Sequence, residues 1–379
     1  MSSLEIILII IFSLLLIYYL NFLGIIYKGL NKLNECHCKK LPEEYISVIV
    51  PFRNEEHNIK NVFESLVNQN YPEERFEIIF VNDNSDDNSL KILKEINKYK
   101  NVRILTVPDD YSINAHKKRA IRYGIDNSNG EIIVTTDADC YHNKNWLRSI
   151  LTCFDEKTAF VSGPTIFKEE ENLFQKMQKI EFAGLVLTGA GLIGANQPTI
   201  CNAANLAYRK KAFNEVNGFY SNMNLSSGDD ELLLQKIFQD TDYKIKFSIS
   251  KDSVVVTQSN KSFKEFYHQR KRWASKGLFY KNKFLIIRLV LIYFFYLALL
   301  IQPFLILYSK IFFPYFMITF GLKSLYEYRI LKKGLDLLFD RNLLKYFLIT
   351  EIVQIPYIVV MGLSGAFGNF VWKNRKIKR

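Results

Sequence analysis

Hydrophobic and polar positions divide the chain into three parts. Apolar residues run almost without interruption over 4–26 and dominate again beyond residue 283, whereas the stretch between alternates short apolar runs with polar segments. A helix needs about 20 consecutive apolar residues to cross a bilayer. The pattern therefore predicts an N-terminal transmembrane anchor (1–27), a soluble domain (28–283) and a C-terminal membrane region (284–379).

The soluble part alternates between the strand and helix periods. Ile59, Val62, Phe63 and Leu66 form an i, i+3, i+4, i+7 stripe that is typical of one helix face. Short apolar runs predict buried strands at 45–50, 76–81, 102–107 and 131–136, and two further helices are expected at 89–99 and 117–126. This alternation predicts an α/β domain with a mainly parallel central sheet. Ligands of such sheets bind beyond the carboxyl ends of the strands.

Charges beside the first apolar segment predict its orientation. No Lys or Arg precedes it, and no small-residue cleavage site follows, which argues against a signal peptide. The basic residues come after it, at Lys28, Lys32, Lys39 and Lys40. Because such residues mark the cytoplasmic side, we expect a multi-pass protein of the inner or plasma membrane with a cytoplasmic soluble domain.

The C-terminal region is predicted to contain about three helices, over 284–308, 311–330 and 346–367. The second is the weakest candidate for a crossing because it contains Lys323 and Glu327. Three crossings would place the basic end, 373–379, outside the cell and against the charge rule. One helix is therefore a candidate for a re-entrant or interfacial position. The uncharged stretch 183–195 is too short to span and predicts a buried or interfacial helix.

Composition narrows the classes of partner. The net charge of +12 fits basic flanks on anionic lipid or a site for an acidic ligand. We expect no nucleic-acid partner, because the chain has membrane segments and no recognised nucleic-acid motif. The five cysteines are odd in number and scattered, which predicts no disulfide framework and a reducing compartment. Cys36-His37-Cys38 lacks further ligands at zinc spacing and is interpreted as an inert linker.

Polar residues follow the first two predicted strands. Pro51, Arg53, Asn54 and Glu55 end the first, a pattern that any strand-to-helix loop could show. Asp83 follows the second and stands where a side chain can face a ligand. The next acidic residues, Asp86 and Asp87, are better explained as caps of the following helix.

The strand at 131–136 ends in a candidate metal motif. Asp137 and Asp139 stand two residues apart on a turn, and carboxylate oxygens suit Mg²⁺ or Mn²⁺. Such a cation would neutralise the diphosphate of a departing nucleotide. Lys117, Lys118 and Arg119 add cationic partners for phosphates, although a solvated helix face explains at least one of them.

Two further motifs lie later in the chain. The run Ser226-Ser227-Gly228-Asp229-Asp230-Glu231 precedes an apolar helix, so its acids could stabilise the helix dipole or supply a general base. Gln269, Arg272 and Trp273 belong to a basic, aromatic segment that could simply lie at the lipid interface. The same residues offer an amide, a guanidinium for a diphosphate and an indole face for a sugar.

The order of these motifs over about 46–273 resembles that of the family 2 glycosyltransferases with a GT-A-type nucleotide-binding fold. Within the family, the flanking membrane segments resemble the branch that includes cellulose, chitin and hyaluronan synthases and ceramide glucosyltransferases. Asn82 and Asp229 depart from the family pattern, which often has Asp and Glu there.

The resemblance implies roles for the candidate residues. Pro51 to Glu55 (with Arg53 and Asn54) and Asp83 would hold the nucleotide sugar, assisted by Lys117 and Asp137. Asp139 would be the direct metal ligand. Asp230, in the place of the family's Thr-Glu-Asp, would be the catalytic base. Gln269, Arg272 and Trp273 would bind the donor diphosphate and the acceptor end.

The resemblance also implies an activity: a metal-dependent inverting hexosyl- or N-acetylhexosaminyl-transferase, using Mg²⁺ or Mn²⁺. Its donor would be a nucleotide sugar, by family habit a UDP-sugar, and its acceptor a lipid or glycan at the membrane. Two alternatives stay open. One is a processive polysaccharide synthase, for which the C-terminal region is short, and the other is a silent sugar-nucleotide-binding scaffold.

Overall fold

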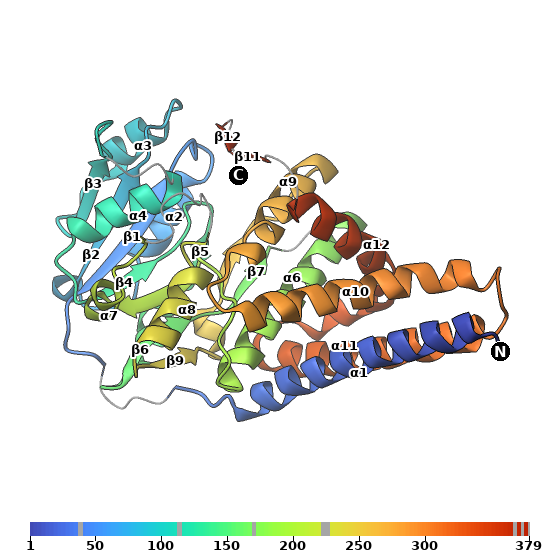
Figure 1. The fold of residues 1–379 in the computed structure, drawn as a ribbon. Coiled ribbons are helices and arrows are strands. Elements are labelled where there is room, and N and C mark those ends of the chain that lie inside the picture. Colours follow the sequence, from blue (N-terminus) through green and yellow to red (C-terminus); the bar gives the residue numbers. More distant parts are fainter. Residues whose placement is uncertain are drawn as a thin grey trace.

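The computed structural model describes residues 1–36, 41–111, 116–168, 172–220, 228–366, 370–372 and 375–377. A lobe built on a β-sheet lies on one side of the molecule, and long helices project from its other side (Figure 1). The chain begins at the far tip of these helices, and its last described residues lie beside the lobe (Figure 1). Predicted segments 37–40 and 221–227, with Cys38, Ser226 and Ser227, lie outside the described residues.

The sheet has seven strands in the order β3-β2-β1-β4-β8-β6-β9. Neighbours are parallel from β3 to β4, β8 is antiparallel to both β4 and β6, and β9 is parallel to β6. The bounds are β1 (Ile46–Phe52), β2 (Phe76–Asn82), β3 (Val102–Thr106), β4 (Ile132–Thr135), β6 (Thr158–Ser162), β8 (Leu206–Arg209) and β9 (Lys244–Phe247). The predicted α/β fold with a mainly parallel sheet is confirmed.

Helices cover both faces of the sheet because alternate strand residues face opposite sides. In β1, Val48 and Val50 belong to one buried cluster and Ile49 to another. The helices of this lobe are α2 (Ile59–Val67), α3 (Ser89–Ile96), α4 (His116–Asp126), α5 (Trp146–Leu151), α7 (Lys210–Glu215) and α8 (Glu231–Asp240).

Short elements join the lobe to the rest. A second sheet has the order β5-β10-β7 and brings the segment near residue 257 beside the turn that follows β4. The short elements are β5 (Tyr141–His142), β7 (Thr165–Phe167), β10 (Val255–Thr257), β11 (Phe370–Trp372), β12 (Arg375–Ile377), η1 (Glu73–Arg75), η3 (Lys251–Ser253), η4 (Gly277–Phe279) and η5 (Arg341–Tyr346). Strands this short carry too few residues for an apolar pattern to predict them.

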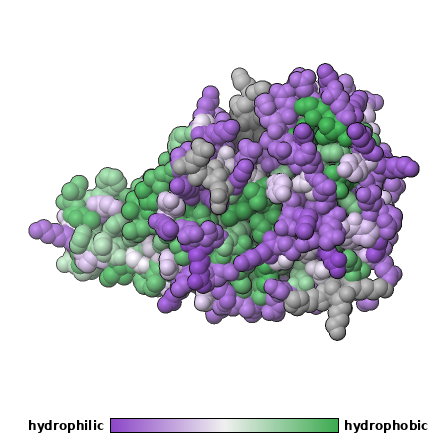
Figure 2. All heavy atoms as spheres, turned by 180° about the vertical axis from the view of Figure 1, so that it is seen from behind, coloured by the Kyte–Doolittle hydropathy of each residue, from purple (hydrophilic) through white to green (hydrophobic). Residues whose placement is uncertain are grey.

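The remaining helices are α1 (Ser3–Lys32), α6 (Leu173–Gly194), α9 (Phe263–Ala274), α10 (Lys283–Leu305), α11 (Phe312–Leu338) and α12 (Phe347–Ala366). Within the described residues, three segments are long and apolar enough to cross a membrane: 3–32, 283–305 and 341–366. Helices α1, α10 and α11 lie side by side in the projection, whose surface is mostly hydrophobic (Figures 1 and 2). Helices α10 and α12 lie close to their predicted positions, whereas α11 continues to Leu338, eight residues beyond its predicted end.

Glycines let α1 pack directly on α6. A Cβ at Gly29 would collide with the backbone of Gly191, and a Cβ at Gly194 would collide with the backbone of Gly29. Small residues at such contacts allow helix backbones to approach closely. The stretch 183–195 was predicted as a buried or interfacial helix, and most of it belongs to the longer helix α6, which contacts both α1 and the lobe.

The prediction that the cysteines form no disulfide is wrong, and the inference of a reducing compartment, which rested on it, loses its support. Cys36, just after α1, forms a disulfide with Cys153, just after α5, at a sequence separation of 117 residues. Cys140 and Cys201 are free. Sequence spacing gave no sign of the pair, because only the folded lobe brings the end of α5 to the linker after α1.

Helices α1, α10, α11 and α12, which we call the membrane helices because all but α11 are long and apolar enough to cross a bilayer, bury a charged cluster. The Nζ of Lys323 on α11 lies 2.5 Å from an Oε of Glu351 on α12 and 3.0 Å from an Oε of Glu327. The hydroxyl of Tyr19 on α1 donates to Glu327 and lies 3.0 Å from that of Tyr296 on α10. The cluster thereby joins all four helices.

Candidate functional site

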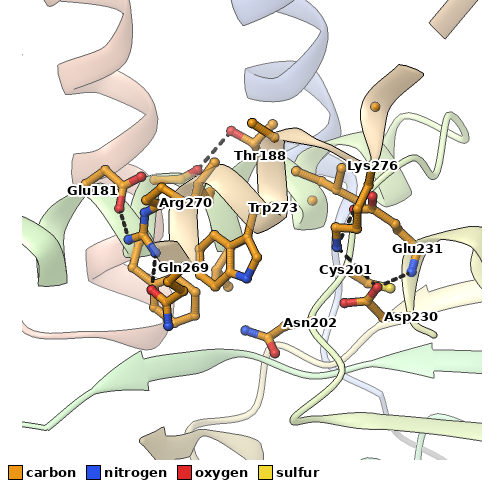
Figure 3. Close-up of a pocket in the computed structure, with 18 of the residues that line it drawn as sticks. Glu181, Thr188, Cys201, Asn202, Asp230, Glu231, Gln269, Arg270, Trp273 and Lys276 are labelled. Atoms are coloured by element: carbon orange, nitrogen blue, oxygen red, sulfur yellow. Dashed lines mark hydrogen bonds and ion pairs between the residues drawn. The ribbon is translucent and has the colours of Figure 1, made fainter. Parts of the chain in front are cut away.

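A cavity of about 870 Å³ lies between the lobe and the membrane helices. Its lobe side is lined by residues that follow β1, β2 and β4, by the start of α8 and by one face of α9. Its other side is lined by residues of α1, α6, α10, α11 and α12. Figure 3 shows part of this cavity, with Trp273, Asn202 and Asp230 around one common space. Parallel strand ends, the predicted location, therefore form one wall.

The loop after β1 is braced by the loop after β2. The Nη1 of Arg53 donates to the carbonyls of Asp83, at 2.6 Å, and of Asn84, and its Nη2 lies 2.8 Å from Asp86. Pro51, Arg53 and Glu55 line the cavity. Asn54 is turned to the neighbouring loop instead: it has a φ of 52° and accepts a hydrogen bond from the backbone of Asp86.

Cations of α4 meet carboxylates at the strand ends. Arg119 donates to Asp83 at 2.9 Å, and Asp83 is buried on the cavity wall. Lys118 is completely buried, and burial lowers its pKa to about 8. The suggestion that a solvated helix face accounts for one of these cations is therefore wrong. Arg119 is directed to Asp83 on the cavity wall, and Lys118 lies in the interior of the lobe.

Lys117 connects the two acidic motifs of the site. Its Nζ lies 2.5 Å from Asp137 and 3.4 Å from Asp229. Burial lowers the pKa of Lys117, but the two carboxylates outweigh it and raise the pKa above its usual value. Burial raises the pKa of Asp229, yet nearby lysines, led by Lys117, hold it below its usual value. These groups thus stay charged and paired.

The aspartate turn after β4 fits a hard divalent cation. Asp137 and Asp139 both line the cavity, and the hydroxyl of Thr257 on β10 donates to Asp139 at 3.2 Å. The oxygen donors suit Mg²⁺ or Mn²⁺. Within the described residues, no group of three His, Cys, Asp or Glu side chains is gathered for metal binding, so oxygens of the nucleotide or water would complete the coordination.

Asp230 begins α8 and serves it as a cap. Its side chain accepts from the backbone N–H of Glu231 at 2.8 Å and from that of Ala203 at 3.3 Å. The carboxylate of Asp230 thus lies at the N-terminus of α8, as the helix-dipole explanation offered from the sequence requires. It also lines the cavity, and an ionised carboxylate has about four lone-pair positions, so acceptor capacity remains for a ligand hydroxyl.

Lys276 is a site residue that the sequence analysis missed. Its Nζ lies 3.4 Å from an oxygen of Asp230 and 3.4 Å from one of Glu231 (Figure 3). Burial lowers its pKa, but these carboxylates outweigh burial and raise it. Lys276 stands three residues after Trp273, so a helix period extended past the aromatic motif would have placed it on the same side.

The two arginines of α9 have different surroundings. Arg270 is buried, pairs with Glu181 on α6 and lies over the ring of Trp273, 4.2 Å from its centroid (Figure 3). It also donates to Gln269, which accepts from Asn260 as well. Arg270 and Gln269 therefore position the indole.

Arg272 faces the carboxylates instead. It lines the cavity, and no ion pair within 4 Å is found for it in the described part of the chain. Burial lowers its pKa, although Asp229, Asp137 and Asp230 oppose that effect. Trp273 lines the same cavity and packs on Phe182. The motif thus offers an indole face and an uncommitted guanidinium beside three carboxylates.

Comparison with known families matches residues 47–216 to "Glycosyl transferase family 2" and residues 132–361 to "Glycosyl transferase family group 2". The second match covers more than half of the 379 residues and contains the aspartate turn, the start of α8 and all of α9.

Curated relatives are similar over part of their length. The probable glycosyltransferase YdaM of Bacillus subtilis is 28% identical over 253 residues, 65% of this chain and 58% of that protein. Poly-beta-1,6-N-acetyl-D-glucosamine synthase of Staphylococcus epidermidis is 25% identical over 255 residues, 66% of this chain and 58% of that protein. A transferase of Methanococcus voltae, named for a dolichyl N-acetyl-alpha-D-glucosaminyl phosphate acceptor, is 30% identical over 150 residues, 37% of this chain and 44% of that protein. The chain thus spans about half the length of the curated relatives it matches.

A solved structure is similar over nearly the whole chain. The mannosyltransferase PcManGT from Pyrobaculum calidifontis, in complex with GDP-Man and Mn²⁺, gives a TM-score of 0.58 at 17% identity. The match covers 94% of this chain and 99% of that one. At this identity the likeness concerns the fold, and it confirms the predicted GT-A-like α/β architecture.

Proposed function

The chain belongs to glycosyltransferase family 2, and from that premise we propose that it transfers a sugar from a nucleotide sugar to an acceptor held in the membrane. One observation carries the proposal: a single cavity reaches from Asp137, Asp139 and Asp230 to the membrane helices. A soluble donor can enter from the lobe side, and an apolar acceptor can enter from the helices.

The donor would bind at the strand ends. Asp83 and Arg53 lie where the nucleoside is expected, and Arg272 and Lys117 line the cavity near Asp137, where the diphosphate is expected. A Mg²⁺ or Mn²⁺ ion held by Asp139, with Asp137 beside it, would supply charge neutralisation of the leaving nucleoside diphosphate. Family habit favours a UDP-sugar, whereas the fold neighbour was solved with GDP-Man.

Transfer then requires a base on the acceptor side. Asp230 takes the proton from the acceptor hydroxyl as its oxygen attacks the anomeric carbon, and the bond from that carbon to the nucleoside diphosphate breaks with inversion. Lys276 orients the carboxylate through the contact described above. Trp273 offers its ring as a platform for the acceptor sugar or the transferred one.

The membrane arrangement supports a lobe on the cytoplasmic side. Lys28 and Lys32 stand at the lobe end of α1, which the charge rule assigns to the cytoplasm. The strand β11 contacts α9, so the chain ends on the same side as the lobe (Figure 1). An even number of C-terminal crossings would return the chain to the lobe side, so one of α10, α11 and α12 would not cross.

The test measures the release of nucleoside diphosphate by the full chain in lipid. A panel of UDP- and GDP-sugars is offered with Mg²⁺ or Mn²⁺ and with lipid and glycan acceptors, beside Asp139→Ala and Asp230→Asn. We expect release from one donor that needs the ion and both carboxylates. Donor binding without release of nucleoside diphosphate from any donor would overturn the proposed transferase activity and favour the scaffold alternative. Long products on a gel would instead favour a processive synthase.

A further inference from the structure

We propose that Arg288 forms a binding site for the phosphate of a lipid acceptor, at the point where the cavity enters the membrane helices. This inference rests on the proposed function and goes further, because it assigns the acceptor a chemical class. Arg288 lies in the second turn of α10 and lines the cavity.

The guanidinium of Arg288 is held in place without being neutralised. Its Nη2 donates to the side-chain amide of Gln197 at 3.0 Å, and its carbon lies 5.6 Å from the ring centroid of Phe22 on α1. Its Nη1 is buried and lacks a hydrogen-bond acceptor among the described residues. No carboxylate of the described chain forms an ion pair with it, unlike Lys117, Lys276 and Arg270.

A positioned guanidinium with spare donors is suited to an oxyanion. Phosphate oxygens accept from a guanidinium with two parallel hydrogen bonds, and a neutral amide partner cannot balance its charge. A charged group near lipid is costly unless it is paired. Arg288 lies at the start of a predicted membrane helix, the level at which lipid phosphates reside.

The surroundings fit a lipid on one side and the reacting groups on the other. Phe22, Leu289, Ile292 and Tyr293 line the adjacent membrane part of the cavity, where an apolar chain can lie. Toward the lobe, the loop that holds Arg288 through Gln197 continues to Ala203, whose N–H holds Asp230. Six residues span at most about 20 Å. A sugar attached through a phosphate to a lipid could therefore extend from Arg288 toward the base.

The test measures binding in the absence of donor. Farnesyl phosphate and farnesol are titrated into the full chain in neutral detergent by calorimetry, for wild type, Arg288→Gln and Arg288→Lys. Arg329→Gln is the matched control, because Arg329 is exposed on α11 and lies outside the cavity lining. We expect wild type to bind the phosphate at least about tenfold more tightly than the alcohol, the size of a lost charge-assisted hydrogen bond.

Arg288→Gln should abolish that preference, Arg288→Lys should restore part of it, and the affinities for farnesol and UDP should not change. A preference that survives Arg288→Gln, or that Arg329→Gln removes equally, overturns the inference. Two further arms separate the sources of phosphate. Displacement by equimolar phosphatidylglycerol would indicate a general lipid site, and displacement by inorganic phosphate at equal concentration a free-anion site. Either result overturns the acceptor assignment.

The two proposals fail in different ways. Binding of farnesyl phosphate that depends on Arg288, with no transfer from any donor, would overturn the proposed function and leave this site standing. Transfer that depends on Asp230 but proceeds equally well to phosphate-free lipid acceptors in wild type and Arg288→Gln would overturn the site alone.

Discussion

The lobe and the membrane helices contain the same arrangement of charges, a lysine between two carboxylates. In the lobe, Lys117 lies between Asp137 and Asp229, and in the helices Lys323 lies between Glu327 and Glu351. Both lysines make one contact at 2.5 Å and a second contact within 3.5 Å. The two groups differ in what surrounds them.

Carboxylates of both groups line the cavity, but the helix group is more deeply buried than the lobe group. The side chain of Asp137 is 32% exposed, but that of Lys323 is 0% exposed and that of Glu351 3%. A carboxylate that water can reach can exchange its lysine for a ligand at small cost. A carboxylate between membrane helices finds no substitute partner. The same three charges are therefore expected to allow ligand exchange in one place and to hold helices together in the other.

The largest expected effect is that of Lys323→Met. The substitution leaves two carboxylates facing each other in the helices, and breaking such a buried pair costs about 3–5 kcal/mol. Thermal unfolding of the full chain in detergent should show a clearly lowered Tm. The double variant Lys323→Met with Glu351→Gln should recover part of the loss. An unchanged Tm in the single variant would contradict the structural role given to this cluster.

Asp230→Asn should cost about a hundredfold in turnover, the effect expected from removing a general base. The amide keeps the shape of the cap, so the Tm should change little. Asp240→Asn, at the exposed far end of α8, is the matched control and should retain activity. Near-normal turnover by Asp230→Asn would remove it from the role of base, and Asp229→Asn would then be the next variant to measure.

Lys117→Met tests the comparison between the lobe group and the helix group, because it removes the central lysine of the lobe group as Lys323→Met does in the helices. Here we expect a Tm within a few degrees of wild type, since water can reach Asp137. Donor affinity should fall about tenfold through loss of a phosphate contact. Calorimetric titration with the nucleotide sugar measures it. A stability loss as large as that of Lys323→Met would erase the distinction drawn between the two groups.

The smallest expected effect concerns pH. Burial raises the pKa of Glu231 from 4.5 to about 7, with Asp230 adding to the rise and Lys276 opposing it. The folded chain then holds a proton that the unfolded chain has released, so this group makes stability fall as pH rises from about 4.5 to about 7. Above that range its effect is constant. Tm measured from pH 5 to 8 should show a shallower decline in Glu231→Gln, and identical profiles would refute this assignment.

The sequence predicted the parallel half of the sheet well because β1, β2 and β4 are buried along their whole length. Four apolar runs became β1 to β4 with bounds shifted by no more than two residues. The antiparallel strand β8 and the small sheet escaped prediction. They are two to four residues long, and distant segments, not a local pattern, determine their pairing.

The sequence predicted those residues of the site that follow a strand or belong to a helix motif. Asp83, Asp137, Asp139, Asp230 and Trp273 all line the cavity. Their chemical roles remain predictions. What the sequence could not give are the pairings between distant segments: Lys276 with Asp230, Arg270 with Glu181, and the disulfide of Cys36 with Cys153. Each depends on how the lobe sits on the helices.

The packing of the lobe on the helices also bears on the distance between the active site and the bilayer. The close approach of Gly29 to Gly191 joins α1 to α6, so an α1 that spans the membrane would hold the lobe at one distance from the bilayer. The proposed phosphate contact lies at the membrane end of the cavity, and Asp230, the candidate catalytic base, lies at its lobe end. The distance between the two would then limit which acceptors can react. The enzyme would select acceptors by the distance from lipid to hydroxyl, and a glycan one unit too short or too long would reach the wrong place.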